Sequence, residues 1–304
     1  MTKVEGAISL RLATKQEKAM KKTALFAAVV VLAAGCTRRV REVPGITYKT
    51  ADPAKLVAAY NENAEKIPTL SAQLEMTLTY KEEGKQKQRT LDAWLDVEKP
   101  ARLRLRHDAL GRDLFYVVSN GTRYWVGLDK AISGGEDTVY TGTLAGLEGE
   151  SLFRPDRLLA AFSLAKLPPA GTTESIPEVY NDRYVMLFLD GSAPRRVLAK
   201  ATFSRVTLML SRYEVFDEES RLALVVEYAY YTGVAGAELP GAVVITWPLD
   251  DLTVAAKVRS AKVGAELPPR LWEFDAGWRR DAKQMELNPT VTIREYRENG
   301  SQGN

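Results

Sequence analysis

The sequence predicts a mainly β (α+β) fold, in which roughly ten or more antiparallel strands form a meander that two helices interrupt. Apolar and polar residues alternate along most of the chain beyond residue 70, which is typical of strands with one buried face. Helical spacing occurs in two stretches, and βαβ alternation is absent, so a parallel sheet is not expected. A curled sheet with an apolar concave face needs a cover, which we expect the two helices to supply.

The first helix is predicted over residues 53–67. Asp52 is a typical N-cap, Pro53 suits the first helical position, and Pro68 ends the helix. Its mostly apolar face consists of residues at helical spacing, namely Leu56, Ala59, Tyr60, Asn63 and Ile67. A second helix is predicted to open at Pro155, to stop before residues 168–169, and to carry Leu158, Leu159 and Phe162.

The strands begin near Ser71, where the apolar period changes to two. The charged segment Lys81–Arg89 is expected to be a solvated hairpin tip, and Asn120-Gly121 is a strong turn signal. Residues 133–137 are expected to form a loop, and the region from there to Glu150 gives no clear pattern. Trp272 and Phe274 are expected to pack on the sheet. The predicted strands cover 74–80, 91–97, 103–105, 114–118, 124–128, 184–189, 197–203, 206–216, 222–231, 241–247 and 252–263.

The run from Lys21 to Cys36 predicts export. Two lysines precede about a dozen apolar residues and a small-residue cleavage site, the order found in secretory signals. The apolar run is shorter than the roughly 20 residues that a membrane-spanning helix needs. Residues 1–35 are therefore predicted to be a signal peptide, with Met20 as an alternative start of translation.

The segment Leu32-Ala33-Ala34-Gly35-Cys36 resembles the lipobox of bacterial lipoproteins, although the leucine lies one residue further from the cysteine than usual. This resemblance implies that Cys36 becomes the new N-terminus and carries acyl chains. Cys36 is the chain's single cysteine, and the alternative is a core cysteine behind an ordinary signal peptide. Residues 36–50 are then a lipidated N-terminus and flexible tether, 51–287 a single domain, and 288–304 a polar tail.

Charge and composition argue against several functions. Without residues 1–35 the chain keeps 36 basic and 37 acidic residues, so its near-neutral charge predicts no nucleic-acid partner. His107 is the single histidine and no nucleophile motif accompanies it, so we expect no catalytic residue. Metal ligands and cofactors are not expected either, because the acidic turns 217–219 and 250–251 are typical of solvated loops. Arg102, Arg104 and Arg106 form a basic stripe that either faces solvent or meets lipid headgroups or an acidic partner.

The order of motifs in residues 91–125 resembles a known superfamily. Trp94-Leu95 is followed by Lys99-Pro100, an arginine-bearing strand, and an Asn120-Gly121 hairpin with Trp125. Together with the initial helix and the segment 240–248, this order resembles the LolA/LolB-like outer-membrane lipoprotein-sorting and lipoprotein carrier proteins over about residues 51–275. Lys99 is a departure, because the residue before this proline is often arginine in that family.

The resemblance implies an incomplete antiparallel β-barrel (a half-barrel) whose open concave side is covered by helices and binds acyl chains. It also implies lipid or lipoprotein acyl chains as ligands, a periplasmic carrier protein as a candidate partner, and a membrane attachment through the lipid on Cys36. Thr37 is not the aspartate associated with inner-membrane retention, so the expected location is the outer membrane, facing the periplasm. The inward-facing candidates for the acyl-chain cavity are Leu74, Met76, Leu78, Leu95, Leu103, Leu105, Tyr116 and Val126.

Two other functions fit the same sequence. The fold can have a filled core and serve as a non-catalytic scaffold or stress-sensing component of the envelope, since core residues and cavity residues look alike in a sequence. An envelope hydrolase that uses His107 is the third alternative, and it lacks a supporting motif.

Overall fold

A computed structural model describes residues 46–82, 85–107, 115–130, 136–144, 154–167, 172–191, 194–274 and 282–286. The residues from Tyr48 onward form one compact unit. The predicted signal peptide, the lipidation site Cys36 and the polar tail 288–304 lie outside the described residues.

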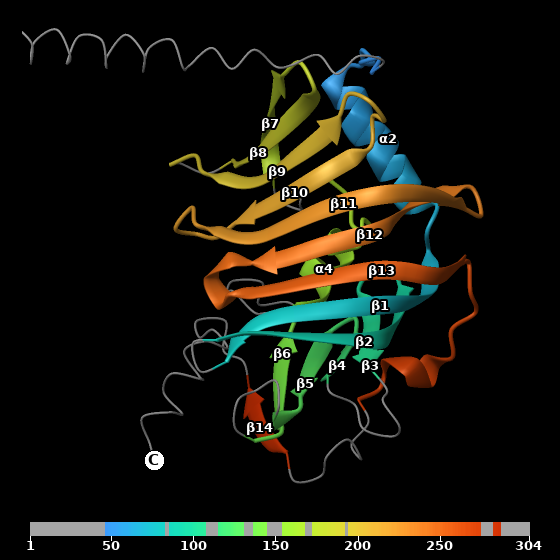
Figure 1. Cartoon of the computed structure of the whole chain (residues 1–304), viewed down its shortest axis with the longest axis vertical. Helices are drawn as coiled ribbons and strands as arrows, with labels where there is room; N and C mark the ends of the chain where they lie inside the picture. Colours follow the sequence, from blue (N-terminus) through green and yellow to red (C-terminus); the bar gives the residue numbers. More distant parts are fainter. Residues whose placement is uncertain are drawn as a thin grey trace, which may run out of the picture. The chain divides into compact units, whose positions relative to one another are not determined.

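The described strands form a single open sheet whose edges are β14 and β7 (Figure 1). Its strand order is β14-β6-β5-β4-β3-β2-β1-β13-β12-β11-β10-β9-β8-β7. All neighbours pair antiparallel except β14, which runs parallel to β6. The strands are β1 (Thr69–Glu82), β2 (Lys85–Glu98), β3 (Arg102–His107), β4 (Phe115–Asn120), β5 (Arg123–Leu128), β6 (Thr138–Thr143), β7 (Thr172–Val179), β8 (Arg183–Asp190), β9 (Val197–Ser204), β10 (Leu210–Phe216), β11 (Leu222–Val234), β12 (Ala237–Trp247), β13 (Leu252–Val263) and β14 (Lys283–Glu286).

Two meanders make up this sheet. Strands β1–β6 form the first and β7–β13 the second, and the pairing of β1 with β13 joins them (Figure 1). The prediction of a mainly β, antiparallel fold is therefore confirmed, and the sheet is open rather than a closed barrel. Three strands were not predicted, namely β6, β7 and β14. Strand β7 carries Pro177 and two acids, Glu174 and Glu178, a composition that suits an edge strand and hides the alternation.

The hairpin between β1 and β2 is longer than predicted. The charged stretch 81–89 was expected as a solvated tip, but the ladder continues from Thr69 opposite Glu98 to Glu82 opposite Lys85. Residues 85–88 are exposed, so their charged and polar side chains reach water from either face while the backbone stays paired. The polar composition of residues 81–89 therefore indicates where the buried part of the hairpin ends, whereas the two strands continue beyond that point.

The described residues contain two α-helices, both near their predicted positions. Helix α2 (Pro53–Glu65) is capped by Asp52, whose carboxylate accepts a hydrogen bond of 3.0 Å from the amide of Ala54. It contacts β8 and β12, whereas the shorter α4 (Pro155–Ala161) contacts β3 and β4. Leu56 of α2 and Leu158 of α4 belong to the same buried cluster as the apolar face of the sheet.

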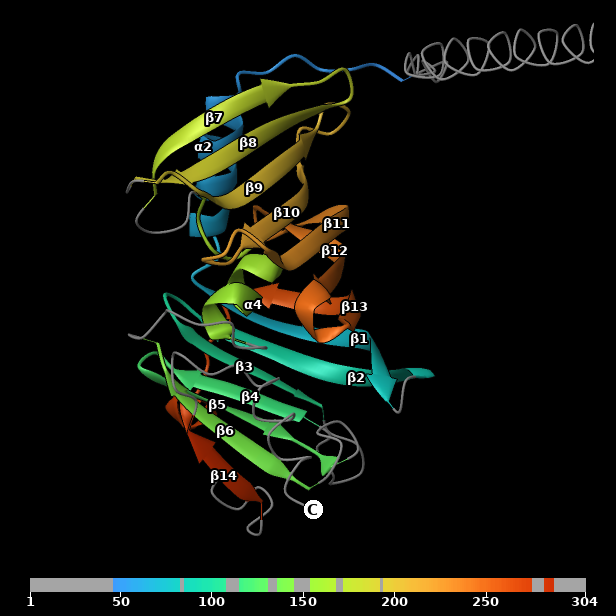
Figure 2. The same ribbon diagram turned by 90° about the vertical axis from the view of Figure 1, so that its left-hand side faces the viewer.

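Helix α4 lies on the chain segment that crosses from one side of the sheet to the other. Strand β6 is next to one edge, and β7 is the opposite edge. The connection between them must therefore pass over a face of the sheet, and the buried leucines of α4 show that this is the apolar face (Figure 2).

A buried polar network links three positions on the other face of β1–β3. Asp96 is 4% exposed and accepts hydrogen bonds from Ser71 Oγ (2.7 Å) and from Arg104 Nη2 (2.6 Å) and Nε (3.1 Å). Nearby, Arg102 pairs with Glu98 at 3.1 Å in a far more exposed setting. The predicted basic stripe is thus partly neutralised, because two of its three arginines are paired with acids.

Removing the acid of this network should destabilise the protein strongly. Asp96→Ala leaves the largely buried Arg104 without its partner, and we expect a loss of about 2–4 kcal/mol in the free energy of unfolding. Glu98→Ala removes the exposed pair on the same strand and should cost no more than about 1 kcal/mol. Urea unfolding of both variants measures the difference; equal losses would contradict this account of Asp96.

Candidate functional site

The apolar face of the sheet brings together seven of the eight predicted cavity residues. All seven are only 0–3% exposed and belong to one continuous cluster. They come from four strands, β1, β2, β3 and β5, which are neighbours or near neighbours in the sheet. The seven residues are Leu74, Met76, Leu78, Leu95, Leu103, Leu105 and Val126. We call this cluster, with the apolar residues of β8–β13 that continue it, the inner face.

Tyr116 does not belong to the inner face. It lies in a second, smaller cluster with Val118, whereas its neighbours Phe115 and Val117 belong to the inner face. Residues 115–119 are buried on both sides of β4, so alternation could not tell which side chains point inward. The inclusion of Tyr116 among the cavity residues is therefore corrected.

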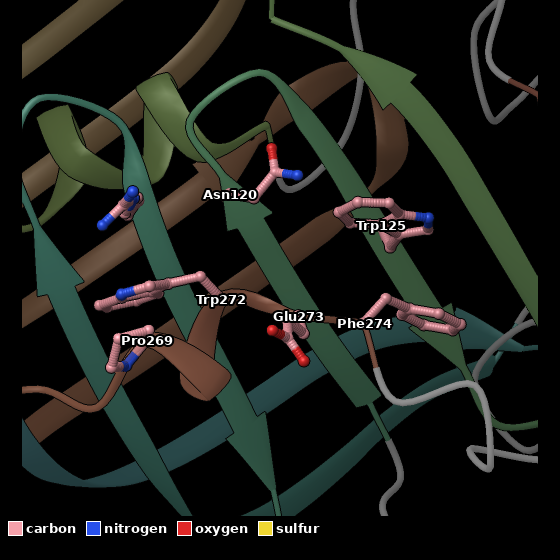
Figure 3. A pocket seen from close by; sticks show the side chains of 7 residues that line it. Asn120, Trp125, Pro269, Trp272, Glu273 and Phe274 are labelled. Carbon is pink, nitrogen blue, oxygen red and sulfur yellow. The ribbon is translucent and has the colours of Figure 1, made fainter.

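The closing segment covers Tyr116 from outside. The 3-10 helix η2 (Pro269–Trp272) and Phe274 lie against β3–β5, as predicted for Trp272 and Phe274. Phe274 stacks on Trp125 with 5.8 Å between ring centroids, and a cleft of about 400 Å³ remains beside them. Figure 3 shows Trp125 and Phe274 at one side of this cleft and Trp272 at the other. The cleft lies on the far side of the sheet from the inner face.

The inner face is in contact with α4 and the turn that follows it. Leu158, Leu159, Phe162, Leu164 and Leu167 are all buried in the same cluster. This segment therefore supplies an apolar surface that matches the one beneath it.

Several polar contacts also tie this segment to its surroundings, among them the exposed ion pair of Lys166 with Glu65. The hydroxyl of Tyr228 in β11 donates to the carbonyl of Ala160 at 2.9 Å. Asn61 of α2 pairs with the backbone of Leu167 in both directions, its Oδ1 accepting from the amide at 2.7 Å and its amide group donating to the carbonyl. Asn63 binds Glu238 of β12 in the same two-way manner. Asn63 lies on the helix face that was predicted to be mostly apolar, and the role of neither asparagine could be read from spacing.

Four tyrosine hydroxyls form a polar group within the apolar interior. Tyr60 comes from α2, Tyr213 from β10, and Tyr228 and Tyr231 from β11. Burial raises the pKa of Tyr60 to about 12, and it raises the pKa values of the other three above their ordinary value. These four residues share no motif, so their meeting in the interior could not be predicted from the sequence.

Tyr228 and Tyr231 are three residues apart on β11, so in a regular strand their side chains would point to opposite faces. An irregularity in the backbone between them lets both side chains reach the interior. Tyr230 has a φ of 56°, which interrupts the alternation between Tyr228 and Tyr231. Gly241 lies opposite on β12, and a Cβ there would lie 2.6 Å from the Tyr230 carbonyl oxygen. Glycine is thus required at 241 for the strand to take this form.

The side chain of His107 is held in place by contacts with the neighbouring strands β2 and β4. Its ring is buried, Nδ1 lies 2.6 Å from the carbonyl oxygen of Asp92, and the ring stacks on Phe115 at 6.4 Å. In the acidic turn 217–221, the Asp217 carboxylate accepts hydrogen bonds from Glu219 and Arg221.

Among the described residues, no group of three or more metal-ligating side chains comes together. No helix in the described part of the chain is long and apolar enough to cross a membrane.

Comparison with known proteins gives similarities of structure. Neither a family model nor a curated protein matches this chain. A LolA superfamily protein from Nitrosomonas europaea is similar with a TM-score of 0.47 and 10% identity, over 72% of this chain and 97% of that protein. A DUF1329 family protein from Desulfovibrio piger is similar with a TM-score of 0.48 and 12% identity, over 73% and 98%.

A third similar structure is a putative outer-membrane lipoprotein-sorting protein domain from Vibrio parahaemolyticus. Its TM-score is 0.42 and its identity 12%, over 71% of this chain and 92% of that domain.

The buried tyrosines predict a loss of stability in alkali. Their pKa values are raised above the ordinary value of 10.0, so their contribution to stability is complete below pH 10 and is lost as the pH rises toward 12. Tyrosinate absorbance at 295 nm should show these four tyrosines ionising after the exposed ones or together with unfolding. Tyr60→Phe should make the alkaline loss less steep, whereas Tyr230→Phe, at an exposed side chain, should leave it unchanged. A folded chain in which all tyrosines titrate together near pH 10 would refute this assignment.

Proposed function

We propose that this chain is a lipid-anchored envelope protein that binds acyl chains, or the acyl chains of lipidated proteins, against the inner face. It would act in the transport or localisation of lipoproteins or lipids at the outer membrane. The observation that carries the proposal is the continuous apolar inner face, which extends through both meanders and contacts α4 and its following turn.

The energetics of such a site need no specific motif. An acyl chain gains about 0.8 kcal/mol for each methylene group that it buries, so an apolar surface of this extent holds it without directional contacts. The tyrosine hydroxyls and the carbonyls around them supply hydrogen-bonding groups within the apolar interior, where an ester or amide of a lipid can be satisfied.

Access requires that the α4 segment moves. The seven predicted residues are almost completely covered, so an acyl chain reaches them only when residues 154–167 lift from the sheet. This helix has only seven residues, and the polar contacts of the segment include those of Ala160 with Tyr228, Leu167 with Asn61 and Lys166 with the exposed Glu65. We therefore propose that this segment is the movable cover of the site.

The location is part of the same proposal. The signal-like run ending at Cys36 supports export and acylation, and Thr37 supports delivery to the outer membrane, with the domain facing the periplasm. A periplasmic carrier protein that hands over acylated cargo is the proposed protein partner.

A second function is favoured by one observation. Side chains that are 0–3% exposed are also what a solidly filled core shows, and such a domain would act as a scaffold or stress-sensing component of the envelope. The two functions differ in whether the α4 segment opens to admit a lipid.

Uptake of a fluorescent fatty acid by the purified processed protein tests the proposal. The wild type should take up one chain reversibly, and native mass spectrometry should show lipid that copurifies with it. Tyr228→Phe removes the hydroxyl that holds Ala160, and the loss of about 1 kcal/mol from this contact should raise the rate of uptake about fivefold.

Tyr184→Phe is the matched control. Tyr184 of β8 is also buried, but its hydroxyl accepts from the amide of Ala51 at 3.0 Å and donates to the carbonyl of Lys49 at 3.3 Å, both outside the α4 segment. Its removal should cost similar stability and leave the uptake rate unchanged. No uptake by the wild type, combined with an interior free of copurified lipid, would contradict lipid binding and favour the scaffold function.

A further inference from the structure

Arg205 holds the residues that lead into the domain at one end of the strands. The amide of Lys49 donates to the carbonyl of Arg205 at 2.8 Å, and Arg205 Nε donates to the carbonyl of Lys49 at 3.2 Å. The Arg205 guanidinium also lies over the rings of Tyr48 and Tyr184, at 6.0 and 5.4 Å from their centroids. The chain therefore enters the domain at a fixed point beside Arg205.

The same arginine joins two turns that carry exposed apolar side chains. Its Nη1 donates to the carbonyls of Tyr180 and Asn181, 3.2 Å each, in the turn between β7 and β8. Arg205 itself begins the turn between β9 and β10. Val179 is 64% exposed, Tyr180 42% and Val206 40%, which is unusual for large apolar residues of this chain. We call these three residues the anchor-proximal tip.

Charged groups of both signs surround the tip: Lys49, Arg183 and Arg205 are basic, whereas Asp182 and Glu178, which accepts a hydrogen bond from the Tyr180 hydroxyl at 2.8 Å, are acidic. Lys49 and Arg183 are exposed, and the Arg183 guanidinium lies 4.9 Å from the centre of the Tyr180 ring while pairing with Asp182 at 3.5 Å. Exposed aliphatic side chains, a tyrosine and arginines together are typical of protein segments at the bilayer interface. The sequence just before Tyr48 adds three arginines against one acid, namely Arg38, Arg39, Arg41 and Glu42.

The length of the tether favours this end of the domain. Eleven residues lie between Cys36 and Tyr48, and this stretch spans at most about 40 Å when fully extended. Because the chain enters beside Arg205, the tip is the part of the domain that stays nearest to an anchor on Cys36. Basic residues on both the tether and the tip suit a bilayer that contains anionic phospholipids.

We propose that the anchor-proximal tip is a membrane-contact surface, which places Val179, Tyr180 and Val206 in the interface of a bilayer with anionic phospholipids. The proposal rests on the proposed lipid anchor at Cys36, and it adds a second, direct contact between the domain and the membrane. That contact would present the strands end-on to the bilayer.

Quenching of single labels tests the contact in the full acylated chain, reconstituted into vesicles of phosphatidylethanolamine and phosphatidylglycerol. Acylation blocks Cys36, so a thiol-reactive fluorophore labels only the introduced cysteine in Val179→Cys, Val206→Cys or Gln88→Cys. Gln88 is exposed in β2 near the β1–β2 hairpin, at the opposite end of the strands from the β7–β8 turn. Iodide should quench labels at 179 and 206 several-fold less than a label at 88.

The outcomes separate this proposal from lipid binding by the inner face. Equal quenching at 179, 206 and 88 would overturn the membrane-contact surface even if the same preparation takes up fatty acid. Protection at 179 and 206 without fatty-acid uptake would support the surface and refute the lipid-binding function. Labelling of the wild-type chain would reveal a free Cys36 thiol, and it would overturn the anchor together with this proposal.

Discussion

The pairing of β1 with β13 is the contact on which the rest of the structure depends. It extends from Leu70 opposite Val263 to Thr79 opposite Thr253, and it joins the first and the last long strands of the domain. Through this ladder two separate meanders become one sheet with one inner face. The two ends of the crossing connection then lie near opposite edges, so the chain between β6 and β7 must pass over that face.

This constraint accounts for the position of α4. A connection that crosses an apolar face must bury apolar side chains of its own, and residues 154–167 do so with five leucine and phenylalanine side chains. Its backbone groups need partners in the interior, which Tyr228 and Asn61 supply in part. The packing of residues 154–167 on the inner face is thus a consequence of this topology, and in the proposed function the same segment covers the lipid site.

Much of this fold could be predicted from alternation. Leu74, Met76 and Leu78 on β1 show a period of two with one buried face, and β13 was predicted with its observed bounds. Strand β4 shows the limit of the method, because Tyr116 and Val117 are both buried and only the closing segment 269–274 distinguishes their two faces. The pairing of Asn61 with Leu167 and the meeting of four tyrosines depend on contacts between segments more than 100 residues apart, or on a local backbone twist such as that at Tyr230. Neither a contact between distant segments nor a local backbone twist produces a periodic pattern in the sequence.

A photoreactive fatty acid whose attachment sites are mapped by peptide mass spectrometry tests the central claim most directly. If acyl chains bind the inner face, the label should attach to peptides of β1–β3 and of residues 154–167, and an excess of unlabelled fatty acid should abolish attachment. Attachment confined to the outer face of the sheet, or none above the background of an unrelated protein, would contradict the account.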